Sequence, residues 1–176
     1  MKTVFFDIDT QIDFVYPAGA LYVPGSERIL PIVGELNRRA PALISTMDAH
    51  TEDDPEFRIY PHHCVAGTAG QHKPAVTMLN DSRQFIVEKQ QLDCFSSPQL
   101  GPLLARLNAD RYVVYGVVTE ICVQCAAFGL LKTGKLVEIV TDAVKAVDEQ
   151  RAREMFSNFT AAGGRLTTSA IVLSPS

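Results

Sequence analysis

Short apolar stretches alternate along this chain with segments of helical periodicity, and this alternation limits the fold more than any other feature. The predicted strands are rich in Val, Ile, Phe and Tyr, as strands buried on both faces of a parallel sheet are. They cover residues 3–8, 42–47, 84–87, 112–117, 136–140 and 166–172. Strand–helix alternation of this kind predicts an α/β fold with a doubly wound parallel sheet of about six strands and helices on both faces.

Helical patterns fill the intervals between the strands and carry start and stop signals. Ser26 and Asp148 are N-cap residue types that precede two of the patterns. Gly134 and the pair Gly163-Gly164 follow the ends of two patterns, where helices commonly stop. The predicted helices cover residues 26–40, 98–108, 120–133 and 148–161.

Length and composition describe an ordinary globular chain and exclude several classes of protein. The 176 residues predict a single domain spanning 1–176 with a sizeable core. A net charge of −4 gives no basic footprint for nucleic acid, and no apolar run approaches the ~20 residues that span a bilayer. The N-terminus is too acidic for a signal peptide. We therefore expect a cytoplasmic protein whose four cysteines are thiols.

Candidate functional residues follow the ends of four predicted strands. Asp9 follows the first, Asp48 and His50 the second, Lys89 the third and Cys122 the fourth. Ligands of doubly wound sheets bind at the carboxyl ends of the strands, near the point where the strand order reverses. These residues are therefore expected to meet at one edge of the sheet.

Cys122 lies in YGVVTEICVQC, where a strand runs directly into a helix. A thiol in the first turn of a helix faces unpaired N–H groups, which favour the thiolate and can also hold an oxyanion. The alternative is a small buried core residue, the commoner fate of a cysteine. Cys122 and Cys125 also form a CxxC of the redox type, which is disfavoured because it lies two-thirds along the chain.

Lys89 ends the apolar run FIVEK. Beside a carboxylate and a thiol, an ammonium would stabilise both anions. The alternative is a solvated lysine at a strand end, which is the commoner situation for any single lysine.

A long polar segment, residues 51–74, holds most of the histidines and interrupts the alternation of strands and helices. Loops of this length in compact domains usually serve a function. Asp48, His50 and His63 offer one carboxylate and two imidazoles, a suitable set for a divalent transition metal with open positions for water or substrate. The acidic run Glu52-Asp53-Asp54 could add a contact, and the alternative is a group of surface polar residues.

The opening KTVFFDIDTQIDF also permits a phosphatase interpretation. Asp7-Ile-Asp9 matches the DxD that begins haloacid-dehalogenase-type phosphatases. Gln11 does not fit that motif, and no later acidic motif of the chain fits well. This interpretation also leaves Cys122 and the histidines without a role, so it stands as a minor alternative.

Several motifs in order resemble those of the isochorismatase-like cysteine hydrolases. DTQIDF at 9–14 and AGALYVPG at 18–25 resemble the D-x-Q-x-D-F and GG-A-L-x-V-P opening of that family. DAH at 48–50 and YPHHCVAGTAG at 60–70 resemble the D-x-H and W-P-x-H-C-x-x-G-T-x-G of its nicotinamidase branch. KQQLDCF at 89–95 and GVVTEICV at 116–123 resemble the segments around its lysine and its nucleophile.

The resemblance implies a Rossmann-like sheet and a catalytic triad of Asp9, Lys89 and Cys122. It also implies a cis peptide before Val118, with the amides of Val118 and Cys122 forming an oxyanion hole. The resemblance to the nicotinamidase branch further implies a divalent metal held by Asp48, His50 and His63. Zinc is the expected metal, and iron and manganese are the alternatives. Phe14 and Tyr60, which replaces a Trp common in that branch, are expected to line the substrate pocket.

These expectations combine into a metal-assisted cysteine amidohydrolase that converts a small, heteroaromatic carboxamide to its acid and ammonia through a thioester. The resemblance suggests a homodimer or larger homo-oligomer, and a small amide is the only other partner expected. Two alternatives stay open beside the phosphatase. One is an isochorismatase-type hydrolase of a different small substrate that needs no metal, and the other is a non-enzymatic binding module on the same fold.

Overall fold

A computed structural model describes residues 1–174 and contains one six-stranded sheet in which every neighbouring pair of strands is parallel. The strand order is β3-β2-β1-β4-β5-β6, so the order reverses between β1 and β4. The predicted α/β class, parallel sheet and number of strands are therefore confirmed. The strands are β1 Thr3–Ile8, β2 Leu43–Asp48, β3 Gln84–Lys89, β4 Arg111–Val117, β5 Leu136–Lys145 and β6 Arg165–Thr167.

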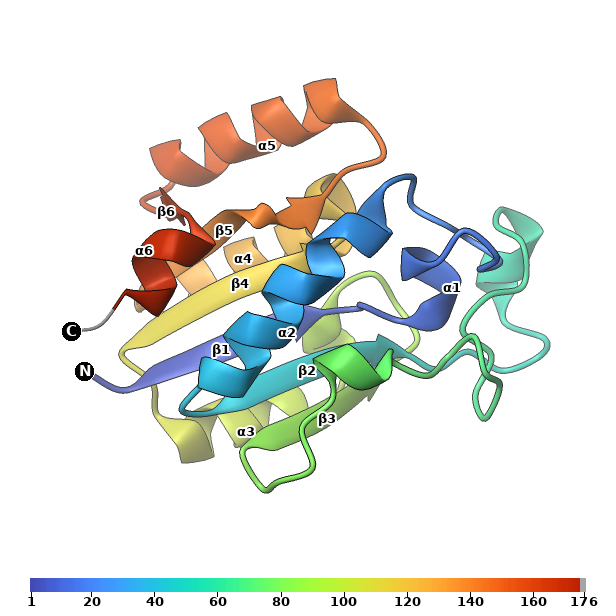
Figure 1. The fold of residues 1–176 in the computed structure, drawn as a ribbon, viewed down its shortest axis with the longest axis horizontal. Coiled ribbons are helices and arrows are strands. Elements are labelled where there is room, and N and C mark those ends of the chain that lie inside the picture. The colour runs from blue at the N-terminus through green and yellow to red at the C-terminus, as the bar shows by residue number, and fades with distance from the viewer. Residues whose placement is uncertain (175–176) are drawn as a thin grey trace.

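Helices cover both faces of this sheet. In Figure 1, α2 (Leu30–Arg39) and α6 (Ser169–Leu173) lie in front of it, whereas α3 (Leu100–Leu107) and α4 (Gln124–Leu131) lie behind. α5 (Glu149–Ala161) packs against α4 through the edge-to-face pair of Phe128 and Phe159. The short α1 (Ile12–Val15) follows β1 at the carboxyl edge, where the irregular segment after β2 also lies (Figure 1).

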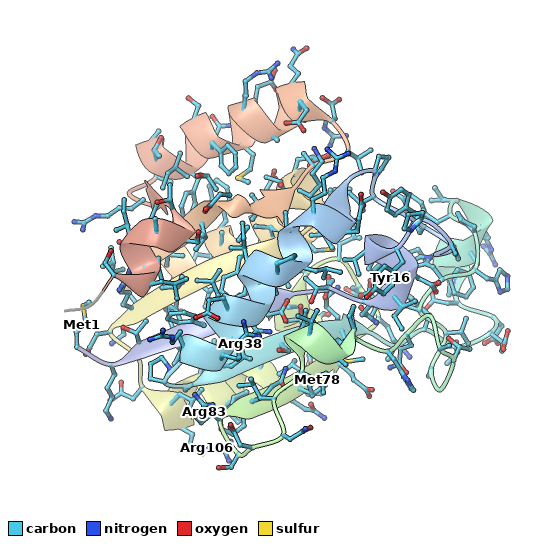
Figure 2. All side chains as sticks on the ribbon, in the orientation of Figure 1. Met1, Tyr16, Arg38, Met78, Arg83 and Arg106 are labelled. Atoms are coloured by element: carbon cyan, nitrogen blue, oxygen red, sulfur yellow. The ribbon has the colours of Figure 1, made fainter. Side chains whose placement is uncertain are left out.

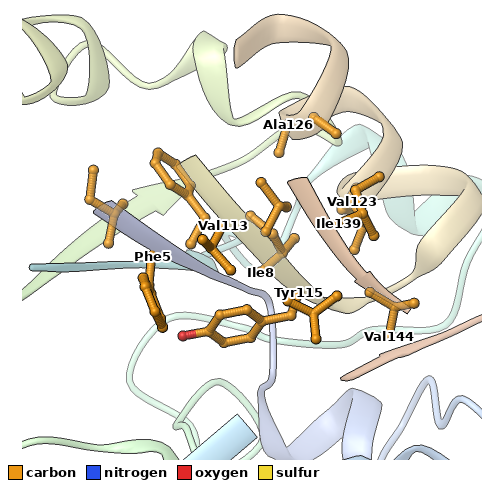
Figure 3. Close-up of a cluster of buried hydrophobic side chains, with 14 of the residues drawn as sticks. Phe5, Ile8, Val113, Tyr115, Val123, Ala126, Ile139 and Val144 are labelled. Atoms are coloured by element: carbon orange, nitrogen blue, oxygen red, sulfur yellow. The ribbon is translucent and has the colours of Figure 1, made fainter. Parts of the chain in front are cut away.

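The core lies on both faces of the central strands β1 and β4. Figure 3 shows Phe5 and Tyr115 side by side on one face. Val123, which ends the turn before α4, and Ala126 of α4 approach the other face. All four side chains are buried. Because residues alternate between the faces of a strand, one strand supplies apolar contacts to both helical layers. The charged side chains lie mostly outside these layers, as Arg38 does on the outer surface of α2 (Figure 2).

Two predicted features are wrong. The last predicted strand, 166–172, stops at Thr167, and Ser169–Leu173 forms α6. The Asp142 carboxylate accepts hydrogen bonds from the backbone N–H and the hydroxyl of Ser169, which stabilises the start of that helix. Ser26 does not cap its helix, because its hydroxyl donates to the Phe14 carbonyl and a 3₁₀ turn, Ser26–Ile29, precedes α2.

Most other predicted boundaries lie within a few residues of the structure, but the strand predicted at 136–140 continues to Lys145. Asp148 caps α5 by accepting hydrogen bonds from the N–H groups of Gln150 and Arg151. The predicted helix 120–133 begins as a π-turn, Thr119–Val123, and continues as α4. No helix within residues 1–174 has the length and apolar character needed to cross a membrane.

Candidate active site

Three side chains meet at the carboxyl edge of the sheet, on both sides of the point where the strand order reverses. Asp9 directly follows β1, Lys89 ends β3, and Cys122 lies in the turn between β4 and α4. Lys89 Nζ lies 2.9 Å from Asp9 Oδ2 and 3.9 Å from Cys122 Sγ. All three residues are at least 94% buried. The structure therefore brings together the carboxylate, ammonium and thiol that the sequence placed after separate strands.

The Asp9 carboxylate has a hydrogen-bond donor at one oxygen and an ion-pair partner at the other. Thr46 on β2 donates its hydroxyl to Asp9 Oδ1 at 2.6 Å. Oδ2 is buried and has no hydrogen-bond partner among residues 1–174, although it faces the Lys89 ammonium. One oxygen is thus fixed while the other stays available as a proton acceptor. Thr46 has no distinguishing pattern in the sequence, and only the pairing of β1 with β2 reveals its role.

Charge and burial set the protonation states of this group. Burial disfavours the charged form of Lys89, but nearby negative charge, that of Asp9 first, outweighs it and raises the Lys89 pKa well above its ordinary value. Burial raises the pKa of the Cys122 thiol well above its ordinary value, and the nearby Lys89 charge only partly opposes this. The resting state is therefore an ammonium beside a protonated thiol, and the thiol needs a base to become a nucleophile.

The backbone before Cys122 has an unusual conformation that requires glycine. The Val117–Val118 peptide is cis, as the resemblance implied. Gly116 has φ +118°, and a Cβ at this position would lie 2.1 Å from the Ile8 carbonyl oxygen. Only glycine fits so close to β1. The Val118 N–H, at the start of the turn that carries Cys122, has no hydrogen-bond partner in the described part of the chain.

Asp48, His50 and His63 form a second group beside the first. Their ligand atoms all lie within 4.8 Å of one another, and all three residues are buried. His50 Nδ1 lies 2.9 Å from Asp54 Oδ2, and His63 Nδ1 lies 2.8 Å from the Pro61 carbonyl oxygen. Because both partners are acceptors, each Nδ1 carries the proton and each Nε2 keeps its lone pair.

These residues fit a divalent transition metal. His50 Nε2 is buried without a partner among residues 1–174, and such an atom is costly unless something binds it. Histidine ligands whose other nitrogen donates to a carboxylate or a carbonyl are the usual arrangement around metals. The predicted acidic contact comes from Asp54 alone, because Glu52 and Asp53 are exposed.

Glu56 is a functional candidate that the sequence did not reveal. Its Oε1 lies 3.8 Å from His63 Nε2, and it forms a second possible metal-binding group with His50 and Asp54. Its only sequence signal is its place in the polar segment six residues after His50. Glu56 could therefore complete a ligand set that the sequence left with three members.

Asp48 connects the two groups. Its Oδ1 accepts a hydrogen bond of 2.5 Å from Lys89, and its Oδ2 lies 3.9 Å from His50 Nε2. Burial and the neighbouring Asp9 charge raise the Asp48 pKa to about 6, against the opposing effect of Lys89. Gln11 fixes the backbone here, since its amide accepts from the Asp48 N–H and donates to the Asp48 carbonyl. The ammonium of Lys89 therefore touches one carboxylate of each group.

A cavity with an empty volume of about 410 Å³ opens onto both groups. Asp9, Asp48, Glu56, His63 and Cys122 supply its polar side, and its apolar walls are Phe14, Leu21, Tyr60, Leu92, Val117, Val118 and Ile121. Phe14 and Tyr60, which were predicted to line a substrate pocket, both line this cavity. Phe14 is buried with its ring centroid 5.5 Å from that of His63, and Tyr60 is 37% exposed at the rim.

The structure argues against two alternative interpretations of the sequence, the DxD phosphatase and the redox CxxC. A DxD phosphatase needs Asp7 and Asp9 in one site, but Asp7 bonds to Asn37 of α2 and Lys73 on the other face of the sheet. A redox CxxC needs a thiol with a lowered pKa, whereas burial raises the pKa of both Cys122 and Cys125.

Comparison with known proteins agrees with this geometry. The isochorismatase domain model matches residues 3–171. A nicotinamidase of Acinetobacter baylyi is 25% identical over 80% of each chain. The zinc complex of a Pyrococcus horikoshii pyrazinamidase superposes with a TM-score of 0.87 and 27% identity, covering 96% of this chain and 99% of the other.

A third similar protein has a bound ligand. PnC1 of L. infantum, in complex with nicotinate, superposes with a TM-score of 0.87 and 28% identity, covering 96% of this chain and 93% of the other. Family match, relatives and fold agree over nearly the whole chain. The chain belongs to the isochorismatase family and is a hydrolase related to the nicotinamidases.

Proposed function

We propose that the protein hydrolyses the amide C–N bond of a small, flat heteroaromatic carboxamide and releases the acid and ammonia. The observation that carries this proposal is the contact of the Lys89 ammonium with both the Asp9 carboxylate and the Cys122 thiol at the bottom of a cavity. A base, a nucleophile and a cation within reach of one another are the parts that covalent amide hydrolysis needs. Related nicotinamidases and pyrazinamidases support the same reaction.

In the first half of the proposed reaction, Asp9 Oδ2 takes the proton from Cys122 Sγ. The sulfur attacks the carbonyl carbon, and the negative charge moves to the carbonyl oxygen. The backbone N–H groups of Val118 and Cys122 are the assigned donors to that oxygen. Asp9 then protonates the leaving nitrogen, the C–N bond breaks, and ammonia leaves a thioester on Cys122.

In the second half, Asp9 removes a proton from water, whose oxygen attacks the thioester carbonyl. The C–S bond breaks, the acid is formed, and the proton returns to the sulfur. Lys89 stays charged throughout, because its neighbours raise its pKa well above the ordinary value. Its charge stabilises whichever of Asp9 and Cys122 is the anion.

A metal would be held by Asp48, His50 and His63, with Glu56 within reach as a further ligand. When bound, a divalent ion would supply a Lewis acid that orients the substrate or a water molecule. The chain itself orients the two imidazoles through Asp54 and the Pro61 carbonyl.

The walls of the cavity favour a flat, mainly apolar ring. Phe14, Leu21 and Tyr60 are among the apolar residues that line it. Pockets of this kind take most of their affinity from apolar contacts and their orientation from a few polar groups. A heteroaromatic carboxamide meets both demands, because its ring fits the walls and its amide faces Cys122.

An ammonia-release assay tests the proposal directly. The purified protein is offered nicotinamide, pyrazinamide, benzamide and an aliphatic amide, with and without a chelator, beside the Cys122→Ala variant. We expect release from the heteroaromatic amides, a loss after chelation and a return on adding zinc. Ammonia released equally by the Cys122→Ala variant would refute the thioester route. Full activity of metal-free protein would instead favour hydrolysis without a metal.

A further inference from the structure

A buried charged network lies on the face of β1 opposite the Asp9 site. Lys73 Nζ lies 3.1 Å from Asp7 Oδ2, and both side chains have no exposed surface. Lys73 also donates a hydrogen bond of 2.7 Å to the Thr10 hydroxyl, which in turn donates one of 2.7 Å to Asp7 Oδ1. Nothing in the proposed reaction uses this lysine, although burying an ammonium is costly.

The network is closed and fully hydrogen-bonded, so it is not a site for a ligand. Asn37 on α2 donates to Asp7 Oδ2 at 2.9 Å and to the Thr77 carbonyl at 2.7 Å. Tyr115 on β4 donates its hydroxyl to the Asn37 amide oxygen at 2.7 Å. None of the buried side-chain atoms without a partner in residues 1–174 belongs to it. Its function has to act through the backbone that it holds.

The first backbone segment that the network holds is the turn that carries Asp9. Thr10 is the next residue, and Asp9 itself has φ +48°, in the left-handed region. A residue other than glycine in this region is strained and persists only where its surroundings hold it. The Thr10 hydroxyl, directly beside this strained residue, accepts a hydrogen bond from Lys73 and donates one to Asp7.

The second backbone segment that the network holds precedes Lys73 and leads to the candidate metal group. The residues just before Lys73 lie along the start of α1, because the Ile12 N–H donates to the His72 carbonyl and the Asp13 N–H to the Gly70 carbonyl. Asp13 in turn accepts a hydrogen bond of 2.7 Å from the N–H of Cys64, the neighbour of His63. Lys73 therefore anchors the point where the Asp9 turn and the His63 segment run side by side.

We propose that Lys73 is a positioning residue that holds the carboxylate of Asp9 in place through Thr10, from the far side of the sheet. The proposal rests on the proposed role of Asp9 as the proton acceptor. Lys73 touches no reacting atom, and its effect passes through the Thr10 hydroxyl and the Asp9 backbone. Misplacing a catalytic group by as little as 1 Å can cost about 100-fold in rate.

Four variants separate this role from simple stabilisation. Thr10→Val removes the hydroxyl and keeps the direct contact of Lys73 with Asp7. Lys73→Met removes the ammonium, and the double variant Asp7→Asn/Lys73→Met removes both charges so that none is left buried alone. The control is Arg111→Met. It breaks the ion pair with Glu138, which lies near the amino ends of β4 and β5, at the edge of the sheet opposite the candidate active site.

Two readouts accompany the melting temperature. One is the kcat and KM of amide hydrolysis. The other is the pH midpoint of Cys122 alkylation by iodoacetamide, followed by peptide mass spectrometry, which needs no amide substrate. Lys89, Asp9 and Asp48 are the charged groups that act on Cys122, and the charge of Asp9 raises its pKa. If Asp9 moves away from Cys122, this effect weakens, the Cys122 pKa falls, and the pH midpoint of alkylation falls with it.

We expect Thr10→Val and Lys73→Met to lower kcat by about 10- to 100-fold with KM nearly unchanged, and to lower the alkylation midpoint. The double variant should recover melting temperature relative to Lys73→Met but not kcat, and Arg111→Met should change only the melting temperature. Wild-type kinetics and an unchanged midpoint in Thr10→Val would overturn the proposal, as would full kinetic recovery in the double variant. If Lys73→Met does not fold, Thr10→Val alone decides. If the wild type hydrolyses no amide, the alkylation midpoint still gives the answer.

Discussion

Two lysines are buried beside carboxylates on opposite faces of the same sheet, and their surroundings differ. Lys73 meets Asp7 and Thr10 in a network whose buried polar atoms all have partners. Lys89 meets Asp9 and Asp48 beside a cavity. Among residues 1–174, His50 Nε2 nearby has no hydrogen-bond partner, and Asp9 Oδ2 has only its ion pair with Lys89. Burial of a charged pair therefore does not mark a reactive site by itself, whereas unsatisfied atoms at a cavity do.

The largest effect that would test this contrast is the loss of the lysine at the cavity. Replacing Lys89 with Met should lower kcat/KM by about 1,000-fold or more, because Asp9 and Cys122 lose the cation that stabilises their anionic forms. Replacing Lys73 with Met should cost more stability and much less activity. Steady-state kinetics and thermal melts of both variants check this prediction, and equal kinetic losses would remove the distinction between the two lysines.

The candidate metal group allows a matched comparison of neighbouring histidines. His63 is buried with its Nε2 facing Glu56, whereas the His62 side chain is 60% exposed. His63→Ala should therefore weaken zinc binding by more than about 100-fold, while His62→Ala should leave it unchanged. Isothermal titration calorimetry of both variants with zinc is the measurement. Similar affinities in the two variants would exclude His63 as a ligand.

A smaller effect follows from the position of Asp48 between the two groups. Its pKa is raised to about 6 by burial and by Asp9, so below pH 6 the metal-free protein holds a proton that a metal must displace. Affinity should fall about tenfold per pH unit below 6 and level off above it. Burial lowers the His63 pKa, so any slope that protonation of His63 adds is shifted toward lower pH. Zinc titrations between pH 5 and 8 give the slope, and a flat profile would contradict the role of Asp48 as a ligand.

The sequence predicted most of the fold because the central strands β1, β2 and β4 are buried on both faces and therefore have a simple apolar pattern. The error at 166–172 arose where pattern and tertiary contact disagree, since Asp142 from β5 holds the start of α6. The main candidate residues were also predictable, because each directly follows a strand or belongs to a motif. Thr46, Glu56 and Lys73 were not, because their roles depend on strand pairing and loop packing that no local pattern encodes.

The central claim is that Cys122 forms a thioester with Asp9 as its proton acceptor. The most direct test mixes the protein with an amide that it hydrolyses, stops the reaction rapidly with acid, and analyses the peptides by mass spectrometry. We predict an adduct on the peptide that contains Cys122, equal in mass to the amide less ammonia, that accumulates in the Asp9→Asn variant only in trace amounts. Steady ammonia release without any such adduct, together with an active Cys122→Ala variant, would contradict the account.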